Sequence, residues 1–290
     1  MSFYGSIEAG GTWMKCAVGD ENASIIDSIV IPVTKRDETI EKMLEYFEDK
    51  DIVALGIACF GPLDLNPDSE TYGYITKTPK IGWENVNIKG IFEDKLKVPV
   101  VIDTDVNGAL LGEVMHGAGK GYKDVVYITI GTGIGAGIYS GGNLVHGMLH
   151  PEAGHIILKS ARGDHYKGKC PFHKYCFEGL ASGPAIEDRW GQKGETLSDK
   201  EEVWEIESEY IAQALVNYIM ILSPKKIILG GGVMNQEVLW PLIREKTLEM
   251  INGYIDTREL RDIDNYIVPA SLGGNQGLVG GLELAKTAIV

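Results

Sequence analysis

The sequence lacks a long apolar run and has a shortage of positive charge. No apolar stretch reaches the roughly eighteen residues that a bilayer-spanning helix needs. The first residues also lack the basic start and apolar core of a signal peptide. Lysine and arginine number 27 against 41 acidic residues, a net charge of −14, which disfavours binding to nucleic acid or anionic membranes. We therefore expect a cytoplasmic protein with no nucleic-acid or membrane partner.

Cysteine is scarce too, with four residues in the chain. Cys16 and Cys59 stand in apolar, strand-like runs and are expected to be small buried hydrophobic residues. Cys170 and Cys176 flank His173 in a C-x2-H-x2-C pattern, and His155 lies upstream. Such a set can form a closed Cys2His2 tetrahedron around Zn²⁺, which a reducing compartment favours over a disulfide. The alternative is a loop of unrelated polar residues; the tight spacing favours zinc.

Two acidic residues, Glu152 and Glu178, lie just outside the candidate zinc ligands at each end of this stretch. A metal site would hold both carboxylates at fixed positions. That arrangement suits the binding of a polyol.

Glycine is abundant, with 37 residues, and it clusters at strand ends, where turns without side chains can approach a ligand closely. The turn Gly10-Gly11-Thr12 joins two short strands and leaves room for a phosphate, although no Walker A lysine follows. Short spacings predict antiparallel hairpins here. Strand, Gly/Thr turn and strand recur around Thr132 and Gly133, where the following strand argues against a dinucleotide fingerprint.

Buried strands are predicted over residues 52–60 and 98–102. The second of them delivers Asp103, Asp105 and Asn107 to its carboxyl end, before a helix predicted over residues 109–116. Ligands of open α/β sheets bind at such ends. One of the two aspartates is expected to cap the helix, and Asp105, beside Asn107, is the candidate general base.

A glycine-rich break at residues 117–121 predicts two domains, 1–118 and 119–290, with the last helix able to pack back on the first domain.

Residues 66–87 are interpreted as a substrate-facing loop or a plain surface excursion. A long amphipathic helix is predicted over residues 199–222. A strand then runs into Gly231 and Gly232 before a helix from about Asn235, an arrangement that can form the floor of a nucleotide site. The final helix, residues 276–288, follows Asn275 and contains small residues that allow close packing.

In chain order these motifs resemble the ROK family of sugar kinases, and most closely its bacterial fructokinases. The resemblance covers nearly the whole chain and is carried by eight motifs. They are Glu8-Ala9-Gly10-Gly11-Thr12, Gly61-Pro62-Leu63-Asp64, Asp103-x-Asp105-x-Asn107-Gly108, Gly131-Thr132-Gly133-Ile134-Gly135, Glu152-Ala153-Gly154-His155, Cys170-x2-His173-x2-Cys176-x-Glu178-Gly179-Leu180-Ala181-Ser182-Gly183-Pro184, Gly230-Gly231-Gly232-Val233 and Gly273-Gly274-Asn275.

The resemblance implies an α/β fold of two actin-like (ribonuclease H-like) ATPase domains around a cleft, with a small zinc-binding loop. It also implies ATP, Mg²⁺ and Zn²⁺ as cofactors, and a homodimer. The implied site residues fall into three groups: Gly10, Gly11, Thr12, Thr132 and Gly133 at the phosphates; Gly231, Gly232 and Asn275 near adenosine; and Asp105, Asn107, Glu152, His155 and Glu178 facing the sugar. His155 would serve the metal and the sugar together.

The chain departs from the common family pattern at two positions. Glu8 stands where most of the family has Asp, and His173 replaces one zinc-binding cysteine. Both departures resemble the fructokinase subgroup. The role of Glu8 toward Mg²⁺ is left open by this difference.

These features predict ATP-dependent phosphorylation of fructose at its 6-hydroxyl, with Asp105 accepting the proton. The alternatives within the family are kinases for glucose, mannose or an N-acetylated hexosamine. A sugar-sensing ROK regulator is a further alternative, disfavoured because the glycine motif begins at Glu8 without a preceding helix-turn-helix. A catalytically silent scaffold is disfavoured by the intact Asp105 and phosphate turns.

Overall fold

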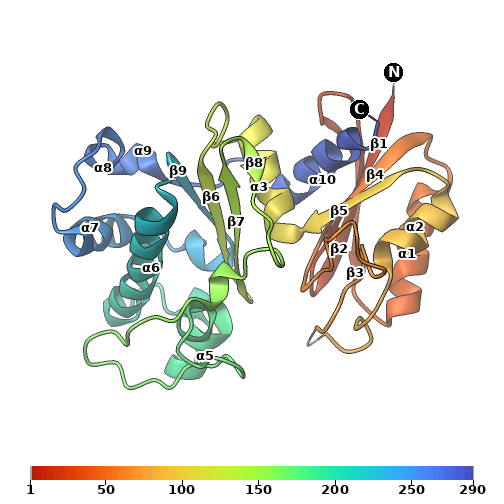
Figure 1. Cartoon of the computed structure of the whole chain (residues 1–290). Coiled ribbons are helices and arrows are strands. Elements are labelled where there is room, and N and C mark those ends of the chain that lie inside the picture. The colour runs from red at the N-terminus through yellow and green to blue at the C-terminus, as the bar shows by residue number, and fades with distance from the viewer. Residues whose placement is uncertain (1, 79, 290) are drawn as a thin grey trace. The chain divides into compact units, whose positions relative to one another are not determined.

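The computed structural model describes residues 2–78 and 80–289, which form two compact units (Figure 1). The first unit comprises Met1–Gly121, Leu144–Pro151 and Ser271–Val290, and the second comprises Tyr122–Asn143 and Glu152–Ala270. The boundary predicted between residues 118 and 119 lies close to Gly121. The final helix belongs to the first unit, and so does the segment Leu144–Pro151, which the sequence did not indicate. No described helix is both long and apolar enough to cross a membrane.

A mixed sheet with the strand order β3-β2-β1-β4-β5 forms the centre of the first unit. Strand β2 pairs antiparallel with both β1 and β3, which confirms the predicted hairpins. Strand β4 pairs in parallel with β1 and with β5. The strands are β1 (Phe3–Ala9), β2 (Trp13–Gly19), β3 (Ile25–Pro32), β4 (Ile52–Cys59) and β5 (Val100–Thr104), and the helices are α1 (Arg36–Glu48), α2 (Ile88–Leu96), α3 (Asp105–His116) and α10 (Gln276–Thr287).

Helix α10 packs against β1, β4 and α3. Gly56 of β4 and Gly281 of α10 approach so closely that a Cβ on Gly56 would overlap the carbonyl oxygen of Gly281. The Ser6 hydroxyl donates a 2.7 Å hydrogen bond to the carbonyl of Leu278 across the same contact. The predicted close packing of the glycine-rich last helix is therefore confirmed, because side chains at these positions would hold α10 away from the sheet. Cys16 and Cys59 are fully buried, as expected.

The second unit contains a sheet with the order β10-β9-β6-β7-β8. Strands β6 and β7 form an antiparallel hairpin, while β9 pairs in parallel with β6 and with β10. The strands are β6 (Val125–Ile130), β7 (Ile134–Ser140), β8 (Asn143–Leu144), β9 (Lys226–Gly230) and β10 (Ile267–Pro269). The helices are α4 (Phe177–Ala181), α5 (Gly183–Trp190), α6 (Glu201–Leu222), α7 (Leu239–Ile251), α8 (Arg258–Arg261) and α9 (Ile263–Tyr266), with 3₁₀ turns η1 (Ala153–His155), η2 (Gly194–Thr196) and η3 (Gly232–Asn235).

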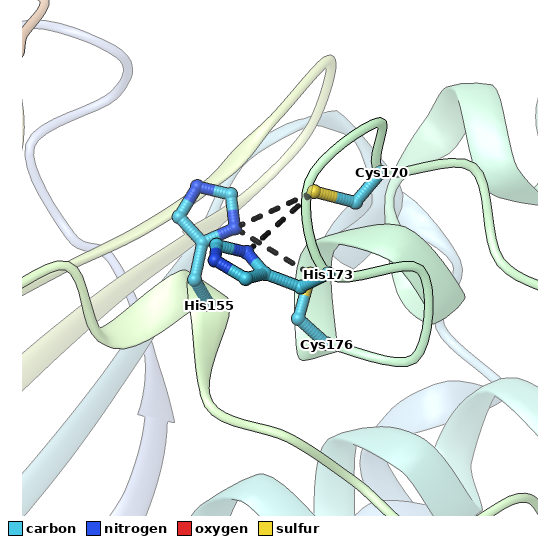
Figure 2. A group of neighbouring side chains, drawn as sticks. All are labelled: His155, Cys170, His173 and Cys176. Carbon is cyan, nitrogen blue, oxygen red and sulfur yellow. Dashed lines mark hydrogen bonds between the residues drawn. The ribbon is translucent and has the colours of Figure 1, made fainter.

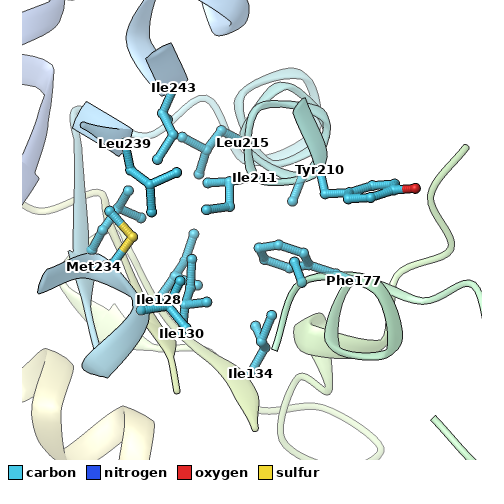
Figure 3. Packing of buried hydrophobic residues seen from close by; sticks show 14 of the residues in the cluster. Ile128, Ile130, Ile134, Phe177, Tyr210, Ile211, Leu215, Met234, Leu239 and Ile243 are labelled. Carbon is cyan, nitrogen blue, oxygen red and sulfur yellow. The ribbon is translucent and has the colours of Figure 1, made fainter. Parts of the chain in front are cut away.

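The core of the second unit lies between the β6 face of the sheet and helices α4, α6 and α7 (Figure 3). Ile211 and Leu215 of α6 are fully buried, as the predicted amphipathic stripe requires. Phe177, the first residue of α4, is fully buried in the same cluster. Because Cys176 immediately precedes Phe177, the cysteine-rich loop is anchored directly to this core.

The helix predicted from Asn235 begins later in the structure. The 3₁₀ turn η3 occupies Gly232–Asn235, and α7 starts at Leu239. Pro241 lies in the first turn of α7, where its missing N–H leaves no intrahelical hydrogen bond unmade. The start position predicted from sequence was therefore wrong by one helical turn.

Candidate active site and metal centre

Strand β5 leads directly into helix α3, and Thr104 is the residue that caps this helix. Its hydroxyl oxygen accepts a 3.1 Å hydrogen bond from the backbone N–H of Asn107. The prediction that Asp103 or Asp105 caps the helix is therefore wrong, as is the predicted helix start at residue 109. A threonine hydroxyl reaches the third helical N–H as an aspartate does. Both neighbouring carboxylates are left available for other contacts.

Asp105 is half-buried at the first position of α3. Burial raises the pKa of its carboxyl group, and this rise is opposed by the N–H of Val106, 2.9 Å from Oδ1, and by the Lys80 ammonium. Desolvation disfavours the charged form of a carboxyl group and so makes the carboxylate a stronger base. This environment suits a proton acceptor.

Asp103 is buried and held by two side chains. Its Oδ1 accepts a 2.7 Å hydrogen bond from Asn107 Nδ2, and its Oδ2 lies 2.9 Å from His146 Nε2. The hydrogen bond to Asp103 raises the pKa of His146. The Oδ1 atom of Asn107 is buried and accepts no hydrogen bond from the residues that the structure describes. In this arrangement Asn107 contacts Asp103, and its predicted contact with a sugar stays a prediction.

The turn between β1 and β2 carries Gly10, Gly11 and Thr12. The N–H of Gly10 donates to the carbonyl of Trp13 at 3.0 Å, which closes the turn. Gly11 and Thr12 are exposed. A Cβ on Gly11 would lie 2.7 Å from Lys80 Nζ, so the absence of a side chain makes room for this ammonium.

Glu8, at the end of β1, forms an ion pair with Lys15 of β2. Lys15 Nζ lies 3.2 Å from both carboxylate oxygens and 3.0 Å from the carbonyl of Gly274. Burial raises the pKa of Glu8, Lys15 lowers it, and the charge of Asp105 raises it further. The carboxylates of Glu8 and Asp105 therefore lie near enough to interact.

In the second unit, Glu178 contacts the glycine turn between β6 and β7. Its Oε2 accepts a 3.0 Å hydrogen bond from the N–H of Ile134. A Cβ on Gly133 would lie 2.9 Å from the same oxygen. The structure thus brings together one residue predicted to face the sugar and one predicted to bind phosphate. Thr132 is exposed beside them.

Four predicted metal ligands converge in the second unit (Figure 2). The ligand atoms of His155, Cys170, His173 and Cys176 all lie within 4.8 Å of one another. Nδ1 of His155 is 3.4 Å from the Cys176 sulfur and 3.9 Å from the Cys170 sulfur, and Nδ1 of His173 is 3.8 Å from the latter. Nε2 of His155 is thereby left outside the cluster.

These distances fit a tetrahedral ion. Zn–S and Zn–N bonds of about 2.3 and 2.05 Å at a tetrahedral angle give a sulfur-to-nitrogen separation of about 3.6 Å. Burial raises the pKa of the Cys176 thiol to about 12, so a cation is needed to hold it as a thiolate at neutral pH. The backbone N–H of Gly179, 3.3 Å from the same sulfur, supports that charge. The donor set therefore fits Zn²⁺.

The other residues predicted to bind the sugar or adenosine lie in other segments of the chain. Glu152 is exposed just before η1, Gly232 is exposed at the start of η3, and Asn275 is exposed at the N-cap of α10 in the first unit. Gly231 has a φ of 89°, and a Cβ there would overlap the backbone of Ile130. The positive φ and the close approach to Ile130 therefore require glycine at position 231, independently of any bound ligand.

Sequence reasoning missed Lys80 as a residue of this region. It stands in the loop interpreted as substrate-facing or merely superficial, and no periodic pattern shows where its side chain goes. The residue before it, Pro79, lies outside the described residues. The structure places the Lys80 ammonium over Gly11 and within electrostatic reach of Asp105.

Comparison with known proteins agrees with this architecture. The ROK family model matches residues 4–288. A protein of Bacillus subtilis (strain 168) is 52% identical over 286 residues, 98% of this chain and 96% of that one. A fructokinase of Pediococcus pentosaceus is 46% identical over 98% of each chain. The crystal structure of a ROK family glucokinase from Streptomyces griseus, in complex with glucose and AMPPNP, aligns with a TM-score of 0.77 and 25% identity over 99% of this chain and 100% of that one. The chain belongs to the ROK family.

Proposed function

We propose that this chain is an ATP-dependent sugar kinase that converts D-fructose to D-fructose 6-phosphate. The observation that carries the proposal is the 46% identity to the Pediococcus pentosaceus fructokinase over 98% of both chains. The solved ROK glucokinase with AMPPNP supports a nucleotide as the phosphate donor. The half-buried Asp105, near the turn that contains Gly11, supports the chemistry.

In the proposed reaction Asp105 accepts the proton of the sugar 6-hydroxyl as its oxygen attacks the γ-phosphorus of ATP. The new O–P bond forms while the bond from the γ-phosphorus to the β,γ-bridging oxygen breaks, and its electron pair leaves with ADP. General-base catalysis of this kind contributes about 10²–10⁴-fold to the rate. The rest of the acceleration comes from alignment and charge neutralisation.

The phosphates are assigned to the two glycine turns, Gly10 to Thr12 in the first unit and Thr132 and Gly133 in the second. The adenosine is assigned to Gly231, Gly232 and Asn275. Mg²⁺ would supply positive charge that neutralises the phosphates of ATP. The carboxylates of Glu8 and Asp105 have the oxygen donors that Mg²⁺ prefers. Because Glu8 is already paired with Lys15, we assign Mg²⁺ mainly to the phosphates of ATP.

The sugar is assigned to Asn107, Glu152, His155 and Glu178, with Asp105 at the reacting hydroxyl. Zn²⁺ has a structural role in this proposal. Held by His155, Cys170, His173 and Cys176, it would fix the loop that precedes α4, and so the position of Glu178 in the first turn of that helix. The proposed assembly is a homodimer.

The proposal is tested by measuring ADP release with ATP, Mg²⁺ and a panel of fructose, glucose, mannose and N-acetylmannosamine. Fructose is expected to give the highest kcat/KM, with the phosphate found on oxygen 6 by NMR. The variant Asp105→Asn is expected to lose at least about 100-fold in kcat while still binding ATP. Asp94→Asn, an exposed aspartate on α2, is the matched control. A higher kcat/KM for another hexose would overturn fructose as the substrate.

A further inference from the structure

Lys80 has an unusual environment for a lysine. Its ammonium lies 3.4 Å from the centroid of the Phe60 ring, a contact that holds the cation by its attraction to the ring face. The side chain is half-buried. Burial lowers the pKa of Lys80, and the negative charge of Asp105 opposes that fall. The cation is therefore held partly out of water at a defined place.

The same ammonium lies close to two residues of the proposed reaction. It is directly over Gly11, where a Cβ would come within 2.7 Å of Nζ, and it acts on the charge of Asp105. Among the residues that the structure describes, none accepts a hydrogen bond or forms an ion pair with this ammonium within 4.0 Å. A half-buried ammonium has three donors, so this one is free to donate hydrogen bonds to the oxygen atoms of a ligand.

We infer that Lys80 is a catalytic residue whose ammonium binds the γ-phosphoryl group of ATP during its transfer to the sugar. The inference rests on the proposed function and adds a charge-stabilising residue to it. The position fits this group because Gly11 belongs to the assigned phosphate turn, and Asp105 is assigned to the hydroxyl that attacks the phosphorus. A cation close to both can reach the equatorial oxygens of the transferring group.

In this step the sugar oxygen forms its bond to the γ-phosphorus and its proton passes to the Asp105 carboxylate. The bond to the bridging oxygen breaks, and ADP leaves with the electron pair. Lys80 donates N–H hydrogen bonds to the γ-phosphoryl oxygens throughout and keeps its own protons. The proton on Asp105 is then released to water. A cation aimed at such oxygens stabilises the transition state more than the ground state.

The test compares Lys80→Met with the wild type. Methionine keeps the length and apolar stem that pack on Phe60, but it removes the charge. We expect kcat to fall by at least about 100-fold, with the KM for fructose changed by less than about threefold and the melting temperature unchanged. Lys77→Met is the matched control, because Lys77 is exposed in the same loop, and it is expected to retain wild-type kinetics.

A second variant separates a chemical role from a structural one. Lys80→Ala leaves space for a small amine, and added ethylammonium is expected to restore the rate at least fivefold in proportion to its concentration. Tetramethylammonium, which has no N–H donor, is expected to restore nothing. A structural role would not respond to either cation. This comparison also decides the question if Lys80→Met fails to fold.

Three results would overturn the inference: a kcat of Lys80→Met above about one third of wild type, a loss confined to the KM for fructose, or no rescue of Lys80→Ala by ethylammonium. These results are distinct from failure of the proposed function. A wild-type protein that phosphorylates no hexose would remove the proposed function itself, whereas an active wild type with an equally active Lys80→Met variant would remove only the role of Lys80.

Discussion

Substitution of Cys176 by serine tests the metal centre most directly. The observed separations from the His155 nitrogen to the two sulfurs are 3.4 and 3.9 Å, on either side of the roughly 3.6 Å expected for a tetrahedral zinc. Serine replaces a thiolate ligand by a hydroxyl that stays protonated at neutral pH. Three ligands then remain, and we expect bound zinc to fall from about one per chain to well below half.

The size of the effect on stability follows from linkage. A ligand present at 100 to 1,000 times its Kd stabilises the folded state by about 2.7 to 4.1 kcal/mol. In domains of 150 to 250 residues, each kcal/mol moves Tm by roughly 2 to 4 °C. Loss of zinc should therefore lower the melting temperature of the second unit by roughly 5 to 16 °C. Because Cys176 adjoins the fully buried Phe177, the loosening should spread into the core beneath α4.

Elemental analysis of the purified chain by mass spectrometry and a thermal melt with and without a zinc chelator measure both effects. Cys16→Ala is the matched control, since Cys16 is a buried thiol of the first unit and is not one of the four candidate metal ligands. It should keep full zinc content and respond to the chelator as the wild type does. A wild-type chain with reduced cysteines and no bound metal, or a Cys176→Ser variant with unchanged zinc, would refute the argument.

Three further predictions concern the first unit. Burial raises the pKa of Asp105, so its protonated form stabilises the fold below the unfolded pKa of about 3.9, and this stability is lost as pH rises through the folded pKa. The variant Asp105→Asn should therefore have a higher melting temperature than wild type at pH 8. The difference should shrink toward pH 5. The hydrogen bond to Asp103 raises the pKa of His146. The protonated imidazole therefore stabilises the fold below the unfolded pKa of about 6.5, and this stability is lost as pH rises through the higher folded pKa. The variant His146→Gln should flatten the dependence of Tm on pH between 6 and 9. Gly56→Ala places a Cβ against the backbone of Gly281 and should destabilise by about 1–3 kcal/mol or more, since no rotamer can relieve it, as seen by denaturant unfolding.

Each of these has a control and an opposing outcome. Asp94→Asn should leave the melting curves unchanged at both pH values, and an equal gain for Asp105→Asn at pH 5 and pH 8 would contradict burial of the charge. An unaltered pH dependence in His146→Gln would show that its ion pair with Asp103 does not form in solution. Gly147→Ala, whose Cβ meets no atom closer than 3.9 Å, should be nearly neutral. Equal stability of the two glycine variants would contradict the packing of α10.

The cluster of candidate metal ligands and the glycine turns could be predicted from sequence because their residues lie close together along the chain. Cys170, His173 and Cys176 are within one short loop, and their spacing alone limits what the side chains can bind. The glycine turns follow from strand runs too close together for anything but hairpins. The position of Asp105 follows from a buried strand that must end at a helix.

Contacts between distant segments could not be predicted in this way. His146 meets Asp103 only because Leu144–Pro151 joins the first unit. Lys80 reaches Gly11 and Asp105 from an irregular loop, where neither helical nor strand periodicity fixes a direction.

The sequence by itself determined the element types, the glycine turns and the donor set for zinc, since these depend on local spacing and chain stiffness. The tertiary structure decided that Thr104 caps α3, that Asn107 contacts Asp103, and that the Lys80 ammonium lies within electrostatic reach of Asp105. The physical reason is that packing sets which side chains come within a few ångströms of one another, and for segments distant along the chain the sequence does not show which of them will meet.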